Sequence, residues 1–546
     1  MTARRWDAPD GTGAVRTVDL AAESAPAGAA GDSIAVAGAT VVSRVTGVAR
    51  FAAIGAVLGP TFFANTYQLT NSLPNLVYYG FLGGSLFSSL LVPSLVRHID
   101  AGDRRACERI AGGFLGMSLL ALVCAAPLAV LAAPYVLAVG HGGQTGTGRL
   151  LILMFVPQIF CYGVVGTSTA VMNAHRRFLL AAAAPALENI GTLAVLGAVA
   201  YVYGTGATTV PTGELVLLGL GTTGAVALHA AVQWWGARRV GVTLLPRAGW
   251  RVAEVRAIVR RSLPSLAQAG LVAAQTLALL MVANRVAGGV VAFQLGLNFY
   301  ALAIALAAQP VALSLLPRLS RMHSGGELAL FRDTLARGVS LGLFLAVPAA
   351  VGYLVLAGPL AHAVTFGRMG DADGVTMVAL SLAGLAGAVV GDTVFMISTY
   401  AWYAGKDTRT PLYSMLVQAT ICLVLAAAAS RLSGLTVLLG LGLALSAAQL
   451  VAAGHLSVRL WRALPAGVER LGPSVAKVVI GAAVLAGPAW LTARLLGPRV
   501  GTAVTLVAAI TVGAGLYLAV QALCRAPELR WLAGGLRYLR GARADG

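Results

Sequence analysis

Long apolar runs separated by short polar links repeat through most of the chain and limit the folds open to it. Each run is long enough to cross the roughly 30 Å hydrocarbon core of a bilayer as a helix. Of the 546 residues, 58% are hydrophobic and only 11% are charged, whereas a soluble chain carries about 25% charged residues. The sequence therefore predicts an all-α polytopic membrane protein.

Fourteen of these runs are predicted to be transmembrane helices. They lie near 34–58, 65–96, 107–137, 149–172, 178–203, 214–237, 262–285, 290–317, 335–364, 374–404, 411–430, 435–458, 475–496 and 500–524. An even number of spans places both ends of the chain on the same side of the membrane. Residues 1–33, which precede the first run, lack the basic-then-apolar order of a signal peptide and are interpreted as a disordered cytoplasmic tail.

The distribution of basic residues indicates the orientation of these spans. With the N-terminus inside, the cytoplasmic segments hold 31 Lys and Arg residues and the outside links hold 6, and Arg44 and Arg50 lie within the first span. This asymmetry agrees with the positive-inside rule. It predicts cytoplasmic termini in an inner or plasma membrane, and it explains the net charge of +19 without a nucleic-acid partner.

Two motifs recur and suggest that the chain is built from two similar halves. LLVPSLVRH at 90–98 and SLLPRLSRMH at 314–323 align Pro93 with Pro317, an offset of 224 residues. MNAHRRF and AGKDTRTP form a second, weaker pair of short basic turns. Six spans separate the members of each pair, so the halves share one orientation. Parallel six-helix bundles around a central cavity are typical of transporters that alternate access.

These patterns predict an arrangement of two pseudo-symmetric six-helix lobes followed by two extra C-terminal helices. The predicted parts are a cytoplasmic N-tail (1–33), an N-lobe of spans 1–6 (34–237), a basic cytoplasmic linker (238–261), a C-lobe of spans 7–12 (262–461), spans 13 and 14 (474–524) and a cytoplasmic C-tail (525–546).

The motifs expected of a soluble enzyme are missing from the sequence. It has no P-loop, nucleophile elbow, HExxH motif or carboxylate pair. The five cysteines are scattered without CxxC or Cys/His spacing, so neither a disulfide framework nor a metal site is indicated. We therefore expect a transporter rather than an enzyme, with no catalytic residues, no bound metal and no cofactor.

Arg44 and Arg50, in SRVTGVAR, are the basic residues within the first span. A charge in the membrane is costly unless it is paired or faces water. Arg44 is close enough to the predicted cytoplasmic end for its side chain to snorkel to the headgroups, whereas Arg50 lies deeper. Because the planar guanidinium binds phosphate bidentately, we favour contact of both residues with an anionic substrate over snorkelling.

Two acids and a histidine also lie within predicted spans. Asp392, midway through span 10, is interpreted either as the partner of a cavity arginine or as a proton acceptor during transport. Glu188 in span 5 is interpreted as a structural partner of Arg176 or Arg177, and His229 in span 6 as a hydrogen-bonded interior residue rather than a pH sensor.

The second span, which contains NSLPNLVYYGFLGGSLFSSLLVPSLVRH at 71–98, has several potential helix breaks. Pro74, Pro93 and the glycines between them predict a helix bent to line a cavity and to move. Asn71 and Asn75, near the first proline, are predicted to satisfy freed backbone groups and to line the substrate cavity.

Four ordered motifs, SRVTGVAR, LPNLVYYGFLGGSLFSSLLVPSLVR, LLPRLSR and YAGKDTRTP, resemble those of the MurJ/MviN lipid II flippase family. That family belongs to the superfamily of MATE exporters and polysaccharide flippases, and the resemblance covers about 34 to 460, as a divergent member of the actinobacterial type. It implies fourteen helices in two lobes around a cationic cavity for a pyrophosphate-linked head group. It also implies that spans 13 and 14 form a groove for the undecaprenyl tail.

The resemblance also implies roles for individual residues. Arg44 and Arg50 match cavity arginines of the first helix. Asp407, Arg409 and Pro411 match, with Thr408 and Thr410, the turn between helices 10 and 11, interpreted here as a gating turn. Asn298 aligns with a position where some members carry a cavity arginine, and is expected to bind substrate.

The chain departs from the family pattern near its second helix. It carries Asn65 where the family commonly has an acid, and Tyr79 where the actinobacterial branch often has Glu. These departures keep a cationic anchor in the cavity and remove acidic partners.

The leading functional prediction is a flippase that moves an undecaprenyl-pyrophosphate-linked cell-wall precursor, with lipid II as the first candidate, from the inner to the outer leaflet by alternating access. The expected partners are this lipid-linked oligosaccharide, membrane lipids and, as candidates, cell-wall synthases. Two alternatives stay open: a MATE-like, ion-coupled exporter of small molecules, and a transport-inactive cell-wall scaffold, which the missing acids motivate.

Overall fold

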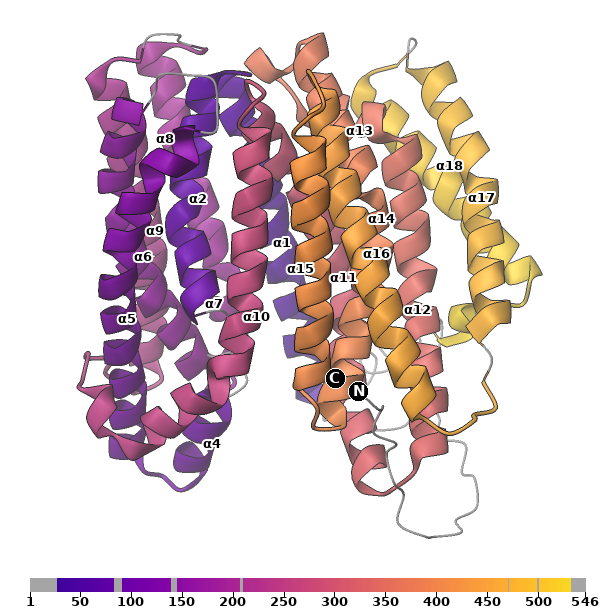
Figure 1. Cartoon of the computed structure of the whole chain (residues 1–546), viewed down its shortest axis with the longest axis horizontal. Helices are drawn as coiled ribbons and strands as arrows, with labels where there is room; N and C mark the ends of the chain where they lie inside the picture. Colours follow the sequence, from indigo (N-terminus) through magenta and orange to yellow (C-terminus); the bar gives the residue numbers. More distant parts are fainter. Residues whose placement is uncertain are drawn as a thin grey trace. The chain divides into compact units, whose positions relative to one another are not determined.

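The computed structural model describes residues 27–82, 91–138, 145–206, 210–469, 471–497 and 500–531, and Figure 1 shows their helices. Within these ranges there is no strand, and thirteen helices are long and apolar enough to cross a membrane by length and composition. The predicted all-α polytopic fold is confirmed. The remaining predicted span, 65–96, corresponds to α2 (Phe62–Leu82) and α4 (Val92–Asp100), and residues 83–90 between them, with the predicted Gly83-Gly84 break, lie outside the described residues.

The helices fall into two compact units. Of the described residues, the N-terminal unit comprises those within 32–295 and 365–374, and the C-terminal unit comprises those within 296–364 and 375–531, with 27–31. The N-terminal unit contains α1 (Ala27–Leu58) from residue 32, α2, α4, α5 (Arg104–Ala138), α6 (Thr145–Ala174), α7 (Phe178–Ala183), α8 (Pro185–Tyr203), α9 (Thr212–Arg239), η2 (Gly249–Arg251), α10 (Ala253–Ala283) and η3 (Gly367–Met369).

The C-terminal unit contains the remaining helices. They are α11 (Gly289–Ser324) from residue 296, α12 (Leu328–Val355), α13 (Ala357–Val364), α14 (Ala372–Ala404) from residue 375, α15 (Arg409–Ala429), α16 (Thr436–Ala463), α17 (Leu471–Leu496) and α18 (Thr502–Leu523). By these contacts α10 groups with the N-terminal unit. The lobe boundaries drawn from the sequence stay a prediction.

The core of the N-terminal unit lies among α4, α5, α6 and α9 and is filled by large apolar side chains such as Phe114 and Leu122. Around it, α6 packs against α9 and α5, and α2 packs against α6 and α10. The predicted basic linker runs along α5, where the Arg247 amide donates to the Gly112 carbonyl at 2.9 Å. Glycine is needed there because a Cβ at Gly112 or Gly116 would collide with the linker backbone.

In the C-terminal unit, α15 packs on α16, and α17 packs on both α12 and α18. The Tyr517 hydroxyl of α18 donates to the Phe344 carbonyl of α12 at 2.8 Å. Glu528 falls in the predicted cytoplasmic C-tail, yet it is fully buried and accepts a hydrogen bond from Ser340. This part of the predicted tail is therefore packed against the helices.

Three predicted element boundaries are corrected. The first helix begins at Ala27, so the last residues of the predicted tail are helical. The fifth span is divided into α7 and α8, because Pro185, at the first turn of α8, has no amide hydrogen to continue the ladder. The ninth span is divided at Leu356 into α12 and α13.

The repeated motifs that align Pro93 with Pro317 are followed by turns of identical hydrogen bonding after α4 and α11. The amides of residues 101, 102 and 103 donate to the carbonyls of 97, 99 and 98, and those of 325, 326 and 327 donate to 321, 323 and 322. In each turn a glycine adopts positive φ, 70° at Gly102 and 75° at Gly326. Every paired position keeps the offset of 224 residues, which supports the predicted repeat.

The second pair of motifs, MNAHRRF and AGKDTRTP, likewise forms turns of identical hydrogen bonding after α6 and α14. The amides of 175, 176 and 177 donate to the carbonyls of 171, 173 and 172, and those of 405, 406 and 407 donate to 401, 403 and 402. A basic residue takes the left-handed conformation in each, Arg176 with φ 58° and Lys406 with φ 59°. The two halves therefore end corresponding helices with the same local structure.

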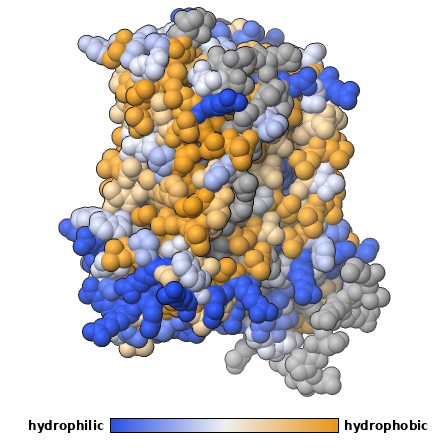
Figure 2. All heavy atoms as spheres, turned by 60° about the vertical axis from the view of Figure 1, so that its left-hand side comes forward, coloured by the Kyte–Doolittle hydropathy of each residue, from blue (hydrophilic) through white to orange (hydrophobic). Residues whose placement is uncertain are grey.

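The face shown in Figure 2 has hydrophobic side chains over its middle and hydrophilic ones gathered along its lower end. That division is the one expected of helices that cross a bilayer and end in its headgroup region.

Candidate functional site

Arg50 of α1 lies in a cluster of polar side chains inside the N-terminal unit. Its Nη1 donates to Glu188 Oε1 of α8 at 3.0 Å, and the two side chains are only 13% and 12% exposed. The same carboxylate accepts a hydrogen bond from the Tyr162 hydroxyl at 3.1 Å and faces His229 Nδ1 at 3.1 Å. One acid thus holds an arginine, a tyrosine and a histidine from three other helices.

The position of this cluster follows from the packing of α1 and α8. The Asn189 amide of α8 donates to the Ser43 carbonyl and the Thr46 hydroxyl of α1, both at 3.2 Å, which aligns the two helices. The apolar span of α1 is Gly38–Leu58, so Arg50 lies about 18 Å along it. A charge at that depth is stable only when it has partners.

The structure corrects one interpretation of these residues and agrees with another. Glu188 pairs with Arg50 and His229, so its assignment to Arg176 or Arg177 was wrong. The reason is that the Glu188 carboxylate is mostly buried against α1, α6 and α9, whereas Arg176 and Arg177 are exposed. His229 is buried and hydrogen-bonded, as predicted. Arg44, by contrast, is exposed.

The side chains of α2 form a second polar group in the same unit. Asn65 donates from Nδ2 to the Val286 carbonyl at 2.7 Å and accepts from the Val290 amide at 3.0 Å. Gln68 bonds to Gln294. These contacts join α2 to the connection after α10 and to the first turns of α11, so the Asn65 side chain has a backbone partner at both its oxygen and its nitrogen.

Asn71 and Asn75, the side-chain amides predicted to satisfy freed backbone groups, differ in their contacts. Asn71 is buried and accepts a long hydrogen bond of 3.5 Å from Gln158 of α6, so its partner is a side chain and that part of the prediction was wrong. The helix continues through Pro74, which leaves few backbone groups to satisfy. Asn75 is half-buried, with its Oδ1 buried and unpartnered. The side chain of Tyr79 lies outside the described residues.

Asp392 of α14 lies in the C-terminal unit and accepts a hydrogen bond of 2.7 Å from the Tyr300 hydroxyl of α11. Among the described residues no salt bridge of Asp392 is seen. Its two interpretations, as the partner of a cavity arginine and as a proton acceptor, stay predictions. Asn298, two residues before Tyr300 on α11, is half-buried.

The predicted gating turn is a tightly hydrogen-bonded helix start. Asp407 accepts from the Arg409 amide at 2.8 Å, the Thr410 amide at 3.1 Å and the Thr410 hydroxyl at 2.8 Å. These bonds satisfy amides that the first turn of α15 leaves without partners. Pro411 lies in that first turn, where its missing amide hydrogen costs nothing.

Within the described part of the chain, no group of three or more His, Cys, Asp or Glu side chains is placed to hold a metal ion. The cysteines are free. The polar residues that carry chemistry here are instead tyrosines and glutamines such as Tyr162, Tyr300 and Gln158. Sequence reasoning missed them because it searched the spans for charges; hydroxyl and amide side chains inside apolar runs were the available signal.

Comparison with known proteins gives a consistent result. Residues 54–510 match the family model described as Lipid II flippase MurJ. The chain is 27% identical over 506 residues to the probable lipid II flippase MurJ of Rhizobium meliloti, covering 89% of this chain and 92% of that protein. It is 25% identical over 394 residues to the lipid II flippase MurJ of Burkholderia cenocepacia, covering 69% and 74%.

Solved structures show the same fold. A structure described as Lipid II flippase MurJ in an inward closed conformation superposes with a TM-score of 0.71 at 15% identity, over 90% of this chain and 98% of that chain. An inward-facing MATE family multidrug resistance transporter gives a TM-score of 0.63 at 14% identity, over 79% and 98%.

Proposed function

The chain belongs to the MurJ family of lipid II flippases, and from this premise we propose that it moves lipid II from the inner to the outer leaflet for peptidoglycan synthesis. The family match over 54–510 is the observation that carries this function. The two relatives described above are named as a probable lipid II flippase and a lipid II flippase, whereas the likeness to MATE exporters is one of fold. The chain acts as a transporter, without covalent chemistry on its substrate.

Arg50 is the residue best suited to bind the diphosphate of the lipid. Its Nη1 is held by Glu188, while its Nε is buried without a partner. A diphosphate offers several oxygens to the planar guanidinium fork, which favours bidentate binding. Glu188 holds the side chain in place before the lipid arrives, and the diphosphate then replaces the carboxylate.

Glu188 does not become an isolated charge in that exchange. Tyr162 and His229 both contact it and remain after Arg50 turns to the lipid. The cost of separating the ion pair is therefore reduced by two hydrogen bonds already in place. Arg44, exposed six residues earlier on α1, adds a second cation for the same head group.

The remaining predicted sites are divided between the two units, with Asp392 and Asp407 in the C-terminal unit and Asn71 and Asn75 in the N-terminal unit. Asp392 and Tyr300 form a hydrogen-bonded pair between α14 and α11, a suitable place to take up a proton during the transport cycle. The capped turn at Asp407 fixes the start of α15, and we assign it the role of a gating turn. Asn71, Asn75 and Asn298 are assigned weaker, polar contacts with the head group.

Complementation tests the function directly. The chain is expressed in cells depleted of their own lipid II flippase, with its membrane level measured by immunoblot. We expect the unmodified chain to restore growth and Arg50→Ala to abolish rescue at an equal membrane level. Arg50→Lys keeps the charge but loses the fork, so it should rescue in part. Arg431→Ala, which removes an exposed arginine in a link, is the matched control and should rescue fully.

Two outcomes would overturn parts of the proposal. Failure of the unmodified chain at normal membrane levels would show that lipid II is not its substrate. Full rescue by Arg50→Ala would instead leave the flippase function standing and remove Arg50 as the diphosphate anchor.

A further inference from the structure

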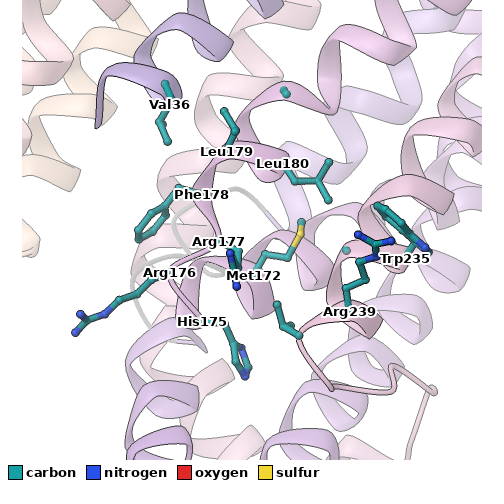
Figure 3. A pocket seen from close by; sticks show the side chains of 14 residues that line it. Val36, Met172, His175, Arg176, Arg177, Phe178, Leu179, Leu180, Trp235 and Arg239 are labelled. Atoms are coloured by element: carbon teal, nitrogen blue, oxygen red, sulfur yellow. The ribbon is translucent and has the colours of Figure 1, made fainter. Parts of the chain in front are cut away.

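A second basic site lies away from Arg50, at the end of the N-terminal unit where α6, α7 and α9 meet the start of α1. It is a pocket of about 920 Å³, shown in Figure 3. We call it the basic pocket. Its lining includes basic and apolar side chains, among them Val36, His175, Arg176, Arg177, Phe178, Leu179, Trp235 and Arg239. Among the side chains that the structure describes, no acidic one lines it.

The cations of this pocket have no anionic partner in the described part of the chain. Arg176, Arg177 and Arg239 take part in no salt bridge there, although Arg239 Cζ lies 4.0 Å from the centre of the Trp235 ring. His175 donates from Nδ1 to the Val171 carbonyl at 2.9 Å, which leaves Nε2 toward solvent or ligand. Arg176, Arg177 and Arg239 therefore offer the hydrogen-bond donors and positive charge that an anion such as a phosphate requires.

The walls of the pocket are apolar and partly exposed. Phe178 is 43% exposed, Leu179 52% and Trp235 47%. The floor is closed because Gly236 of α9 lets Met172 and Leu180 approach closely; a Cβ at this position would collide with both. The short helix α7 is held against α9 by a hydrogen bond from Gln233 to the Ala181 carbonyl at 3.3 Å.

We propose that the basic pocket binds the headgroup of an anionic phospholipid of the surrounding bilayer. The arginines would hold the phosphate, and the first part of the acyl chains would lie against Phe178, Leu179 and Val36. The pocket lies at the basic ends of three membrane-spanning helices, the side that the charge asymmetry assigns to the cytoplasm. Basic pockets between helices on that side suit anionic headgroups. The proposal does not depend on which lipid the protein transports.

Native mass spectrometry of the purified full-length chain tests this site. The probes are phosphatidylglycerol and, as a zwitterionic comparison, phosphatidylethanolamine. The pocket variant is Arg176→Gln/Arg177→Gln/Arg239→Gln. An arginine near an anionic surface contributes about fivefold in affinity, so we expect the pocket variant to lose phosphatidylglycerol affinity on the order of 100-fold, while the weak phosphatidylethanolamine binding stays unchanged.

The chain offers a matched control. Arg256, Arg260 and Arg261 line a separate hollow on α10 with only Ala257 between them, so their change to Gln removes the same charge where no apolar wall exists. We expect this control to keep nearly all phosphatidylglycerol affinity. Equal losses in both variants would mean unspecific attraction and overturn the site, as would an unchanged pocket variant.

Two further measurements separate the possible sources of the phosphate and guard against misfolding. Soluble pyrophosphate that competes as well as the phospholipid would reveal a free-anion site, and preferential binding of undecaprenyl diphosphate would reveal a substrate site; either result overturns the proposal. Gel filtration and thermal unfolding establish that the variants are folded. If the triple variant does not fold, the single change Arg177→Gln takes its place, with an expected loss of about fivefold in phosphatidylglycerol affinity.

Discussion

At the scale of single residues, the paired charges inside the N-terminal unit bear on stability as well as on the proposed function. A buried carboxylate left without its cation, or the reverse, costs about 3–5 kcal/mol, whereas replacing both partners by apolar residues is close to neutral. Arg50 and Glu188 are mostly buried, so this asymmetry applies to them.

We therefore predict that Glu188→Ala lowers the free energy of unfolding by about 3 kcal/mol, because it leaves Arg50 as an uncompensated buried charge. The double variant Arg50→Met/Glu188→Leu should recover most of that loss. Unfolding in mixed detergent with increasing denaturant measures both. Additive effects of the single changes would mean that the two side chains are not energetically coupled.

The sequence was sufficient to find Arg50 and Glu188, because charges within apolar runs are rare. Their pairing was not predictable, since 138 positions separate them and no local periodicity links them. The same holds for Asp392, whose partner Tyr300 is uncharged. Candidate residues can be found from the sequence because burying a charge is costly. Their contact partners depend on tertiary packing, which the sequence pattern does not give.

At the scale of elements, the turns that end the helices carry the repeat. Gly102 and Gly326 both have positive φ, a conformation that costs other residues about 1–2 kcal/mol. A Cβ at Gly102 would meet no atom within 4 Å, so only the backbone effect applies there.

We predict that Gly102→Ala lowers the free energy of unfolding by about 1 kcal/mol. Lys406→Gly should raise it by up to about the same amount, because glycine accepts the left-handed conformation that Lys406 now occupies. Thermal unfolding of the two variants beside the unmodified chain checks both signs. A stabilising Gly102→Ala would contradict the turn geometry.

Glu254 of α10, in the predicted basic linker, contacts three side chains of α4 in the repeated Pro93 motif; we call this group of contacts the clamp. Glu254 Oε1 accepts from Ser94 at 2.8 Å and lies 3.4 Å from Arg97 Nη2, and its carboxylate contacts His98. Burial raises the pKa of Glu254, but the hydrogen bonds from Ser94 and His98 and the charges of His98 and Arg97 outweigh this, so the pKa lies below its ordinary value.

A depressed carboxyl pKa stabilises the folded state above the unfolded pKa, near 4.3, and this contribution is lost as the pH falls through the folded value. We predict that stability falls less between pH 5.5 and pH 3.5 in Glu254→Gln than in the unmodified chain. The substitution removes only the carboxyl group, so the difference between the two curves reports on Glu254. Parallel curves would show that the clamp contributes nothing.

At the scale of the whole molecule, the bilayer itself makes the fold predictable. Spans must be about 20 apolar residues long and fully helical, which is why thirteen predicted spans recur as helices. The breaks within spans, such as the one at Leu356 between α12 and α13, were not predictable because they keep the same hydropathy. The kinks depend on packing, which a hydropathy pattern does not contain.

The orientation of all these helices depends on the basic residues, so it can be tested at single positions. Arg409 follows α14 on the predicted inside, and Arg431 follows α15 on the predicted outside; both are exposed. In a chain whose own cysteines are replaced, we predict that Arg431→Cys reacts with a membrane-impermeant maleimide in intact cells and that Arg409→Cys reacts only after lysis. The reverse pattern would place the basic pocket on the outer side, away from the leaflet in which the substrate is made, and the direction of transport proposed here would then be wrong.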